Sequence, residues 1–205
     1  SWQPVKDAVS YSILKNGKQV ASVQTNSFGI EKNGTAEYQV VAVDKNKVTS
    51  FASEPVLITG DKNVKTFEAE NFASKSDSAF KGFTGKGFVE ISTSVNRNLS
   101  FKVDIEKPGL YSIDFRYANG NGPTNTENKC AIRTLKVDNR ETGTVVFPQR
   151  GKNEWSNWGY SNSVKVYLPK GNHVISLSLE EFDNNMNGII NQAMIDNLRV
   201  IMLGE

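Results

Sequence analysis

The stretch LSFKVDIEKPGLYSIDFRY, residues 99–117, contains two runs in which every second residue is apolar. Between the runs stands Lys107-Pro108-Gly109, a combination typical of a turn. Strict alternation of apolar and polar residues predicts a strand with one buried face. We therefore expect a β-hairpin here, whose buried faces carry Leu99, Phe101, Val103 and Ile105 on one strand and Tyr111, Ile113, Phe115 and Tyr117 on the other.

The same pattern recurs along the chain. Residues 164–168 and 174–179 alternate around the turn Pro169-Lys170-Gly171 and predict a second hairpin. No window has apolar residues at the spacing of an amphipathic helix. Short strands separated by Asn, Gly, Asp and Pro predict an all-β protein, a β-sandwich followed by a β-jelly roll.

Composition narrows the classes of function. The 205 residues have a formal net charge of +2 with the two signs interspersed, which argues against a nucleic-acid-binding stripe. No apolar run approaches the length of a membrane span, and the first residues lack the pattern of a signal peptide. The single Cys130 and single His173 favour packing roles over a catalytic dyad, because no third residue is placed to orient them.

The composition changes near residues 59–63, which suggests two domains, 1–59 and 64–205. Trp2 and the strand-like residues 38–44 give the first part a resemblance to a fibronectin type III domain, an immunoglobulin-like sandwich. The first strand of that family has no counterpart, so the resemblance implies a partial domain with an open sheet edge. We expect that the chain is a fragment of a longer polypeptide or that this edge is covered in another way.

Carboxylates stand in two segments that otherwise resemble buried strands. Glu68 and Glu70 flank Ala69, and Asp196 follows Ile195 about 130 residues later. A buried carboxylate needs a counter-charge, and no Lys or Arg is obviously available at the place where the three carboxylates would meet. If the strands are neighbours, with Glu68 and Glu70 on one face, a bound calcium ion satisfies all the carboxylates, since calcium prefers several oxygen ligands. The alternative is an exposed sheet edge with solvated acids.

Several motifs in residues 64–203 are similar in order and spacing to carbohydrate-binding modules of families 6 and 35. The motifs are FEAENF (67–72), GFVEI (87–91), GLY (109–111), RYANG (116–120), LKVD (135–138), WSNW (155–158), LPKGNH (168–173) and IDNL (195–198). The resemblance implies a galactose-binding-like β-jelly roll. It also implies a structural calcium held by Glu68, Glu70 and Asp196, with further backbone ligands for which residues 94–97 are a guess.

A sugar site is expected around Trp155 and Trp158, because flat aromatic rings match the C–H faces of sugars and indoles are costly to expose without use. The alternative is that one of them covers the core. Asn119, Asn121, Phe88 and Gln192 are the other expected carbohydrate contacts. The loop 183–188 is rich in amides, which suit vicinal hydroxyls but equally suit turns.

One position departs from the resemblance. The family commonly has an Asn two residues before the last-strand Asp, and this chain has Met194 there, with Gln192, Asn191 or Asn187 as possible substitutes. Arg116 and Arg133 could bind a uronate carboxylate. Arg116 is more simply explained on the outer sheet surface or paired with Asp114.

No catalytic motif is present, and Glu180 and Glu181 are adjacent, so they cannot face each other across a cleft. We expect a non-catalytic, calcium-stabilised carbohydrate-binding region of a larger secreted, periplasmic or cell-surface enzyme that degrades polysaccharide, with its catalytic domain upstream in the same polypeptide. One alternative is a structural domain that packs on that catalytic domain and binds no sugar. Another is a protein-adhesion module.

Overall fold

The computed structural model describes residues 1–30, 34–53, 55–124 and 126–204. The chain divides into two compact units, Ser1–Val64 and Lys65–Glu205, at a point next to the expected boundary. Both consist of β-strands, with two short 3-10 turns, so the all-β prediction is confirmed. No helix among the described residues is long and apolar enough to cross a membrane.

The first unit is a four-stranded sheet in the order β2-β1-β3-β4. A tight turn joins β1 to β2 at Asn16 and Gly17, whose φ angles of 50° and 79° match the left-handed backbone that two-residue hairpins need. Tyr11 and Ile13 on β1 are buried on one face of this sheet. The strands are β1 (Ala8–Lys15), β2 (Lys18–Val23), β3 (Ala36–Asp44) and β4 (Val56–Ile58).

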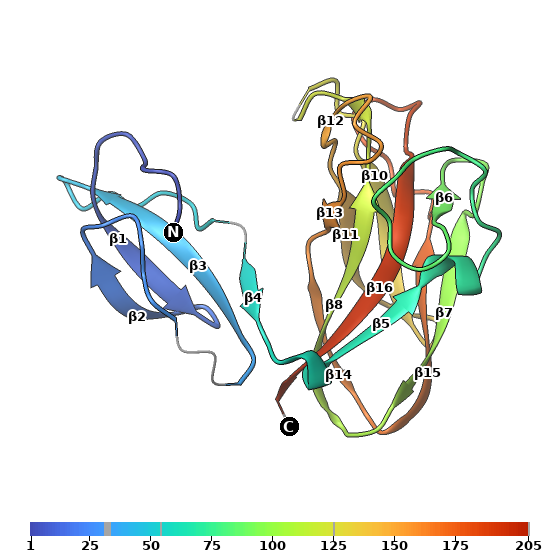
Figure 1. The fold of residues 1–205 in the computed structure, drawn as a ribbon, viewed down its shortest axis with the longest axis horizontal. Helices are drawn as coiled ribbons and strands as arrows, with labels where there is room; N and C mark the ends of the chain where they lie inside the picture. Colours follow the sequence, from blue (N-terminus) through green and yellow to red (C-terminus); the bar gives the residue numbers. More distant parts are fainter. Residues whose placement is uncertain (31–33, 54, 125, 205) are drawn as a thin grey trace. The chain divides into compact units, whose positions relative to one another are not determined.

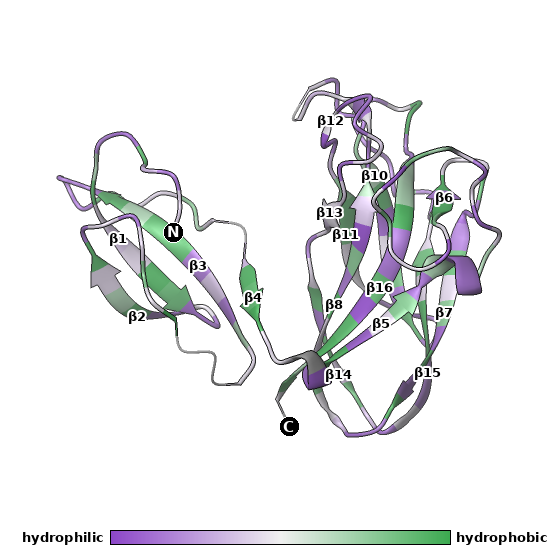
Figure 2. Ribbon diagram, viewed as in Figure 1, coloured by the Kyte–Doolittle hydropathy of each residue, from purple (hydrophilic) through white to green (hydrophobic). Residues whose placement is uncertain are grey.

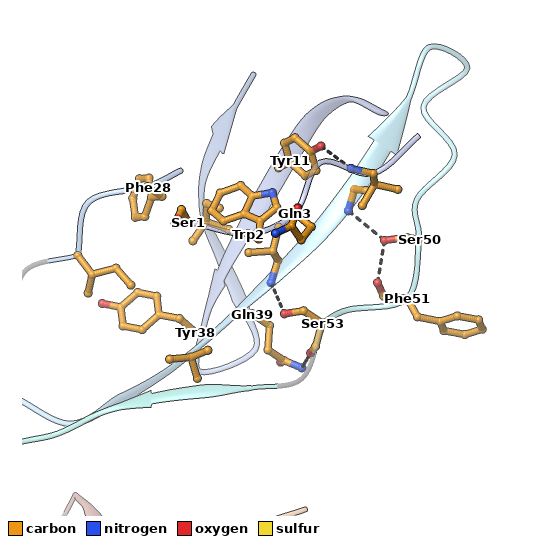
Figure 3. A pocket seen from close by; sticks show the side chains of 16 residues that line it. Ser1, Trp2, Gln3, Tyr11, Phe28, Tyr38, Gln39, Ser50, Phe51 and Ser53 are labelled. Carbon is orange, nitrogen blue, oxygen red and sulfur yellow. Dashed lines mark hydrogen bonds between the residues drawn. The ribbon is translucent and has the colours of Figure 1, made fainter. Parts of the chain in front are cut away.

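A pocket of about 490 Å³ lies over the apolar face of this sheet (Figure 3). Trp2 packs edge-on against Tyr11 with ring centroids 5.2 Å apart, and Phe28 and Tyr38 line the same hollow. The described residues of this unit form one sheet rather than two packed sheets. The fibronectin type III resemblance therefore stays a prediction.

The second unit contains a four-stranded sheet and a six-stranded sheet, labelled by their strands in Figure 1. One has the order β11-β10-β15-β7, and the other has the order β13-β8-β16-β5, with β14 paired to β8 and β6 to β16. The strands of the first are β7 (Asn98–Ile105), β10 (Ala131–Val137), β11 (Arg140–Phe147) and β15 (Gly171–Ser178). Those of the second are β5 (Val64–Glu68), β6 (Val89–Ile91), β8 (Gly109–Ala118), β13 (Gly159–Tyr160), β14 (Val164–Leu168) and β16 (Ala193–Gly204). A separate pair joins β9 (Asn121–Gly122) to β12 (Gly151–Lys152). The 3-10 turn η2 (Ala69–Asn71) belongs to this unit, and η1 (Asp61–Asn63) ends the first unit.

Both predicted hairpins are wrong in their pairing, although their strands are present. β7 pairs with β15, whereas β8 pairs with β14 and β16, so the chain crosses from one sheet to the other at Pro108. β14 and β15 are separated in the same way. Alternation specifies which face of a strand is apolar but not which strand lies beside it. Here the apolar faces of consecutive strands meet across the sandwich, as the 5.9 Å separation of the Phe101 and Phe115 ring centroids shows.

The core of the second unit fills the space between the two sheets. Figure 2 shows hydrophobic and hydrophilic residues alternating along these strands. The fully buried aromatic and large aliphatic side chains include Leu99, Phe101, Ile105, Ile113, Phe115, Tyr117, Leu135 and Phe147. Removing such side chains from water stabilises the fold by roughly 1.5–3 kcal/mol each, so burial of these residues is the main source of stability for the sandwich.

Candidate functional site

The three carboxylates predicted to meet are brought together beside one loop. Thr84 donates its backbone N–H to Asp196 Oδ1 at 2.9 Å, and its hydroxyl lies 2.9 Å from Glu68 Oε2 and 3.1 Å from Asp196 Oδ2. The backbone N–H of Lys86 donates to Glu70 Oε1 at 2.6 Å. Gly85 has φ +63°, and a Cβ there would collide with the Glu70 carboxylate. We call Glu68, Glu70 and Asp196 the acidic cluster.

The route by which Glu68 and Glu70 reach this cluster differs from the prediction. β5 ends at Glu68, and residues 69–71 form the 3-10 turn η2, so the two acids are not alternate residues of one strand. The turn buries Ala69 completely and still directs both carboxylates toward Gly85. Residues 94–97, the guessed source of backbone ligands, make other contacts: Asn96 donates its amide to the Glu90 carbonyl, and the Arg97 carbonyl accepts from the Leu179 N–H.

A counter-charge is present that the sequence did not suggest. Arg116 on β8 forms an ion pair with Asp196, which is fully buried, and donates to the Gly82 carbonyl at 3.0 Å. Asp114, proposed as its partner, instead pairs with Arg199 at 2.6 Å. Burial raises the pKa of Asp196, an effect that the hydrogen bonds from Arg116 and Thr84 oppose. Burial likewise raises the pKa of Glu68, helped by repulsion from Asp196 and Glu70.

Two oxygens of this region remain without partners. Glu70 Oε2 and Asn197 Oδ1 are buried and accept no hydrogen bond within the described residues. An unsatisfied buried acceptor is costly, and a hard cation would satisfy it. The donor set, carboxylate and amide oxygens, therefore fits calcium in kind. Among the described residues, however, no three His, Cys, Asp or Glu side chains are already gathered as a metal-ligand group.

Trp155 and Trp158 belong to a small aromatic cluster on one side of β16. Its other members are Phe80, Phe83 and Phe88, which pack with Ala118 and Met194. Trp155 stacks on Phe80, with ring centroids 5.6 Å apart and planes 11° apart. Trp158 donates its indole N–H to the Lys81 carbonyl at 2.7 Å, and Arg116 lies over its ring. Both indoles are half-buried, so each partly covers this cluster.

The loop that carries the two tryptophans is fixed by local hydrogen bonds. Arg150 donates its Nε–H to the Asn157 carbonyl at 2.8 Å, and Asn157 returns an amide hydrogen bond to the Arg150 carbonyl at 3.0 Å. Gly120 lies against the indole of Trp155, and a Cβ at that position would come within 2.8 Å of three ring atoms. Trp155 therefore has a defined position.

The amide side chains predicted to contact sugar lie near one another, but their N–H groups donate hydrogen bonds to other protein atoms. Asn119 is fully buried and donates to the carbonyls of Phe147 and Lys129 at 2.9 and 3.2 Å. Asn121 donates to Asn119 Oδ1 and to the Gln192 carbonyl. Gln192 donates its amide to Glu90 at 2.9 Å. Of these, Asn121 and Gln192 are partly exposed.

Phe88 and Met194 are both buried, so they support the aromatic cluster from beneath. Arg133 is also fully buried, held by Asn191 and the Ser92 carbonyl, and burial lowers its pKa to about 10. It is thus not accessible to a uronate.

The amide-rich loop before β16 follows turn chemistry. Asn185 and Asn187 accept hydrogen bonds from backbone N–H groups within the loop, and Asp183 accepts from the Thr134 and Glu180 backbones. Amide and carboxylate oxygens used in this way shape the loop rather than stay free to bind a ligand.

Two features of the site were missed from the sequence. Phe80, which stands alone in the polar run 74–81, is central to the aromatic cluster. Residues 75–83 and 86–88 also line an open groove of about 590 Å³. An isolated aromatic in a polar loop was the available signal for Phe80.

Comparison with known proteins supports the all-β fold and assigns the second unit to a family. The model of the carbohydrate binding module (family 6) matches residues 68–198. A cycloisomaltooligosaccharide glucanotransferase of Niallia circulans is 33% identical over 61% of this chain, which corresponds to 12% of that enzyme.

Among solved structures, a cycloisomaltooligosaccharide glucanotransferase of Paenibacillus sp., in complex with cycloisomaltoheptaose, has a TM-score of 0.50 and 27% identity, covering 68% of this chain and 18% of that one. A family 35 carbohydrate binding module from an environmental isolate has a TM-score of 0.50 and 26% identity, covering 66% and 91%. Because the family model spans more than half of its residues, the chain belongs to carbohydrate-binding module family 6.

Proposed function

We propose that the jelly roll binds oligosaccharide or polysaccharide without catalysis and serves a larger secreted carbohydrate-active enzyme. Family membership over residues 68–198 is the observation that carries this proposal. The chain spans about an eighth of the glucanotransferase of Niallia circulans, whose name points to α-1,6-linked glucose as the first ligand to try. A bound module raises the local concentration of an attached catalyst at its substrate.

The binding surface in this proposal is the aromatic cluster with its partly exposed neighbours Asn121 and Gln192. The two half-buried indoles provide apolar ring surface, and the side-chain amide oxygens of Asn121 and Gln192, whose N–H groups bond to the protein, would accept from sugar hydroxyls.

The test is affinity electrophoresis in gels that contain dextran, xylan or mannan, followed by calorimetric titration with isomalto-oligosaccharides. We expect Trp155→Ala and Trp158→Ala to reduce retardation, and Trp155→Phe to have a smaller effect. Tyr167→Ala is the matched control, because Tyr167 is an exposed aromatic on β14. Absence of retardation by every polysaccharide, with an intact circular dichroism spectrum, would refute the proposal.

A structural calcium is the second part of the proposal. The support is the convergence of Glu68, Glu70 and Asp196 beside Thr84, together with the unsatisfied Glu70 Oε2 and Asn197 Oδ1. When bound there, the cation would supply positive charge that ties β5 to β16. Arg116 supplies part of that charge already, so calcium would add to the ion pair rather than replace it.

Calcium at a hundred times its dissociation constant stabilises the folded state by about 2.7 kcal/mol. For a unit of this size, that corresponds to a rise in melting temperature of roughly 5–10 °C. The measurement is calorimetry in calcium and in EGTA, with Glu70→Gln expected to lose the difference and the exposed Glu181→Gln to keep it. Equal melting temperatures in calcium and EGTA would contradict the proposed site.

A packing role without sugar binding is the second candidate function. One loop exposes three apolar side chains, with 64% of Phe182, 87% of Met186 and 80% of Ile189 accessible to solvent. Exposed apolar side chains on an ordered loop suit a protein contact. This candidate is favoured if no glycan binds while Met186→Ser or Ile189→Ser weakens association with an attached catalytic domain.

A further inference from the structure

Phe80 occupies ring surface that a bound sugar would need. Its ring stacks on Trp155 at a centroid distance of 5.6 Å with planes 11° apart. It also stacks on Phe88 at 5.8 Å with planes 24° apart. Phe80 thus bridges two of the residues expected to contact carbohydrate.

A sugar ring and Phe80 would compete for the same place. Sugars present flat C–H faces to aromatic rings in much the way that one aromatic ring stacks on another. Gly120 already lies against the Trp155 indole, which further limits the ring surface left for a ligand. Binding by stacking on Trp155 therefore requires Phe80 to leave.

Hydrogen bonds hold the backbone around Phe80 at two points, Ser76 and Lys81, and few hold the residues between them. The N–H of Ser76 donates to the Phe88 carbonyl at 2.7 Å, and the N–H of Lys81 donates to Ser156 Oγ at 3.0 Å. Among the described residues, the backbone of residues 77–80 makes one hydrogen bond, from the Ser78 N–H to Ser76 Oγ at 3.3 Å. A segment with so few backbone hydrogen bonds opens at low cost.

Space for the displaced ring lies directly beside it. The groove of about 590 Å³ is lined by Phe80 itself and by its neighbours in residues 75–83 and 86–88. The ring can move from the stack into this groove while the anchors at Ser76 and Lys81 stay in place.

We propose that Phe80 is a built-in competitor that closes the sugar-binding slot between Trp155 and Phe88, and that glycan binds when residues 77–80 swing Phe80 out. The inference rests on the proposed carbohydrate binding. The closed state lowers the apparent affinity by the fraction of molecules that are open. Removing the ring should therefore tighten binding.

The experiment compares Phe80→Ala with Phe83→Ala by calorimetric titration with isomalto-oligosaccharides and by gels containing dextran, xylan or mannan. Phe83 is the matched control because it belongs to the same cluster and contacts Phe88 at 5.3 Å in a tilted rather than stacked arrangement. We expect Phe80→Ala to lower the dissociation constant by about tenfold or more. Phe83→Ala should give no such gain. Phe80→Leu, which keeps apolar volume but cannot stack, serves if the alanine variant unfolds.

The outcomes separate the inference from the function on which it rests. Tighter binding by Phe80→Ala or Phe80→Leu alone supports the inference. If the unmodified protein binds and neither Phe80 variant binds more tightly, the competitor role is overturned while carbohydrate binding stands. Equal gains in the Phe80 and Phe83 variants also overturn it, because they indicate general loosening. If no variant binds any glycan, the proposed function fails, and the inference fails with it.

Discussion

Replacing Gly120 by alanine tests how tightly the tryptophan loop is fixed to the end of β8. The Cβ of that alanine would lie 2.8 Å from Cγ, Cδ1 and Cδ2 of Trp155, whereas ordinary carbon contacts begin near 3.4 Å. The indole must therefore retreat by about half an ångström or more. That movement is opposed by the stack of Trp155 on Phe80.

The magnitude follows from the cost of overpacking a well-packed site, which is about 1–3 kcal/mol. For a domain of roughly 150 residues, each kcal/mol moves the melting midpoint by about 2–4 °C. We expect Gly120→Ala to lower the melting temperature of the jelly roll by about 2–12 °C.

The assay is calorimetric or near-ultraviolet circular dichroism unfolding of the complete chain. Gly204→Ala is the control, since a Cβ there meets nothing within 4 Å. In a Trp155→Leu background the cost of Gly120→Ala should shrink, because the clashing ring is gone, and the double-mutant cycle measures the coupling. A Gly120→Ala variant as stable as Gly204→Ala, or a cycle with no coupling, would refute the assigned packing.

Two further predictions concern buried polar groups. Asn119→Ala should destabilise the jelly roll by about 2–4 kcal/mol in urea unfolding, because one buried and one partly buried backbone carbonyl lose their donor; a loss below about 0.5 kcal/mol would show that Asn119 is not structural. The His173 ring nitrogens lie 2.7 Å from Asp138 Oδ2 and 2.9 Å from the Pro169 carbonyl, two acceptors that suit the protonated ring. Burial lowers the pKa of His173, but these hydrogen bonds outweigh it and leave the pKa raised, while backbone and His173 hydrogen bonds overcome the burial of Asp138 and lower its pKa. The stabilisation from His173 is therefore complete below its unfolded pKa of about 6.5 and declines as pH rises through the folded value. His173→Gln should flatten the melting temperature between about pH 6 and 9, and an unchanged slope would contradict this.

The strands were predictable because alternation is a local property, and their pairing was not. The apolar residues of β7 and β8 are where residues 99–117 place them, but the neighbours of each strand come from more than 40 residues away. Nothing in the alternation of either run distinguishes a hairpin from a crossover between two facing sheets.

At the site, too, the sequence indicated which residue types take part but not how they are arranged. The meeting of Glu68, Glu70 and Asp196 followed from the need of buried acids for a common partner, yet Arg116 was not recognised, because its match with Asp196 depends on the register of β8 against β16. Asn119 has an amide of the kind that binds sugar hydroxyls, so its residue type suggested a sugar contact. Its side chain is fully buried, which shows a structural role and could not be read from the sequence.

The position of β16 has a consequence for how the molecule folds. This strand, the last of the described elements, lies between β8 and β5 and also pairs with β6. During synthesis the edges of its neighbours stay unpaired until residues 193–204 have emerged, so the second sheet cannot close early. Strand pairings between residues far apart in the sequence form slowly, and incomplete chains expose unpaired strand edges that can aggregate. Expression yield should therefore depend more on chaperones and growth temperature than the stability of the finished protein would suggest.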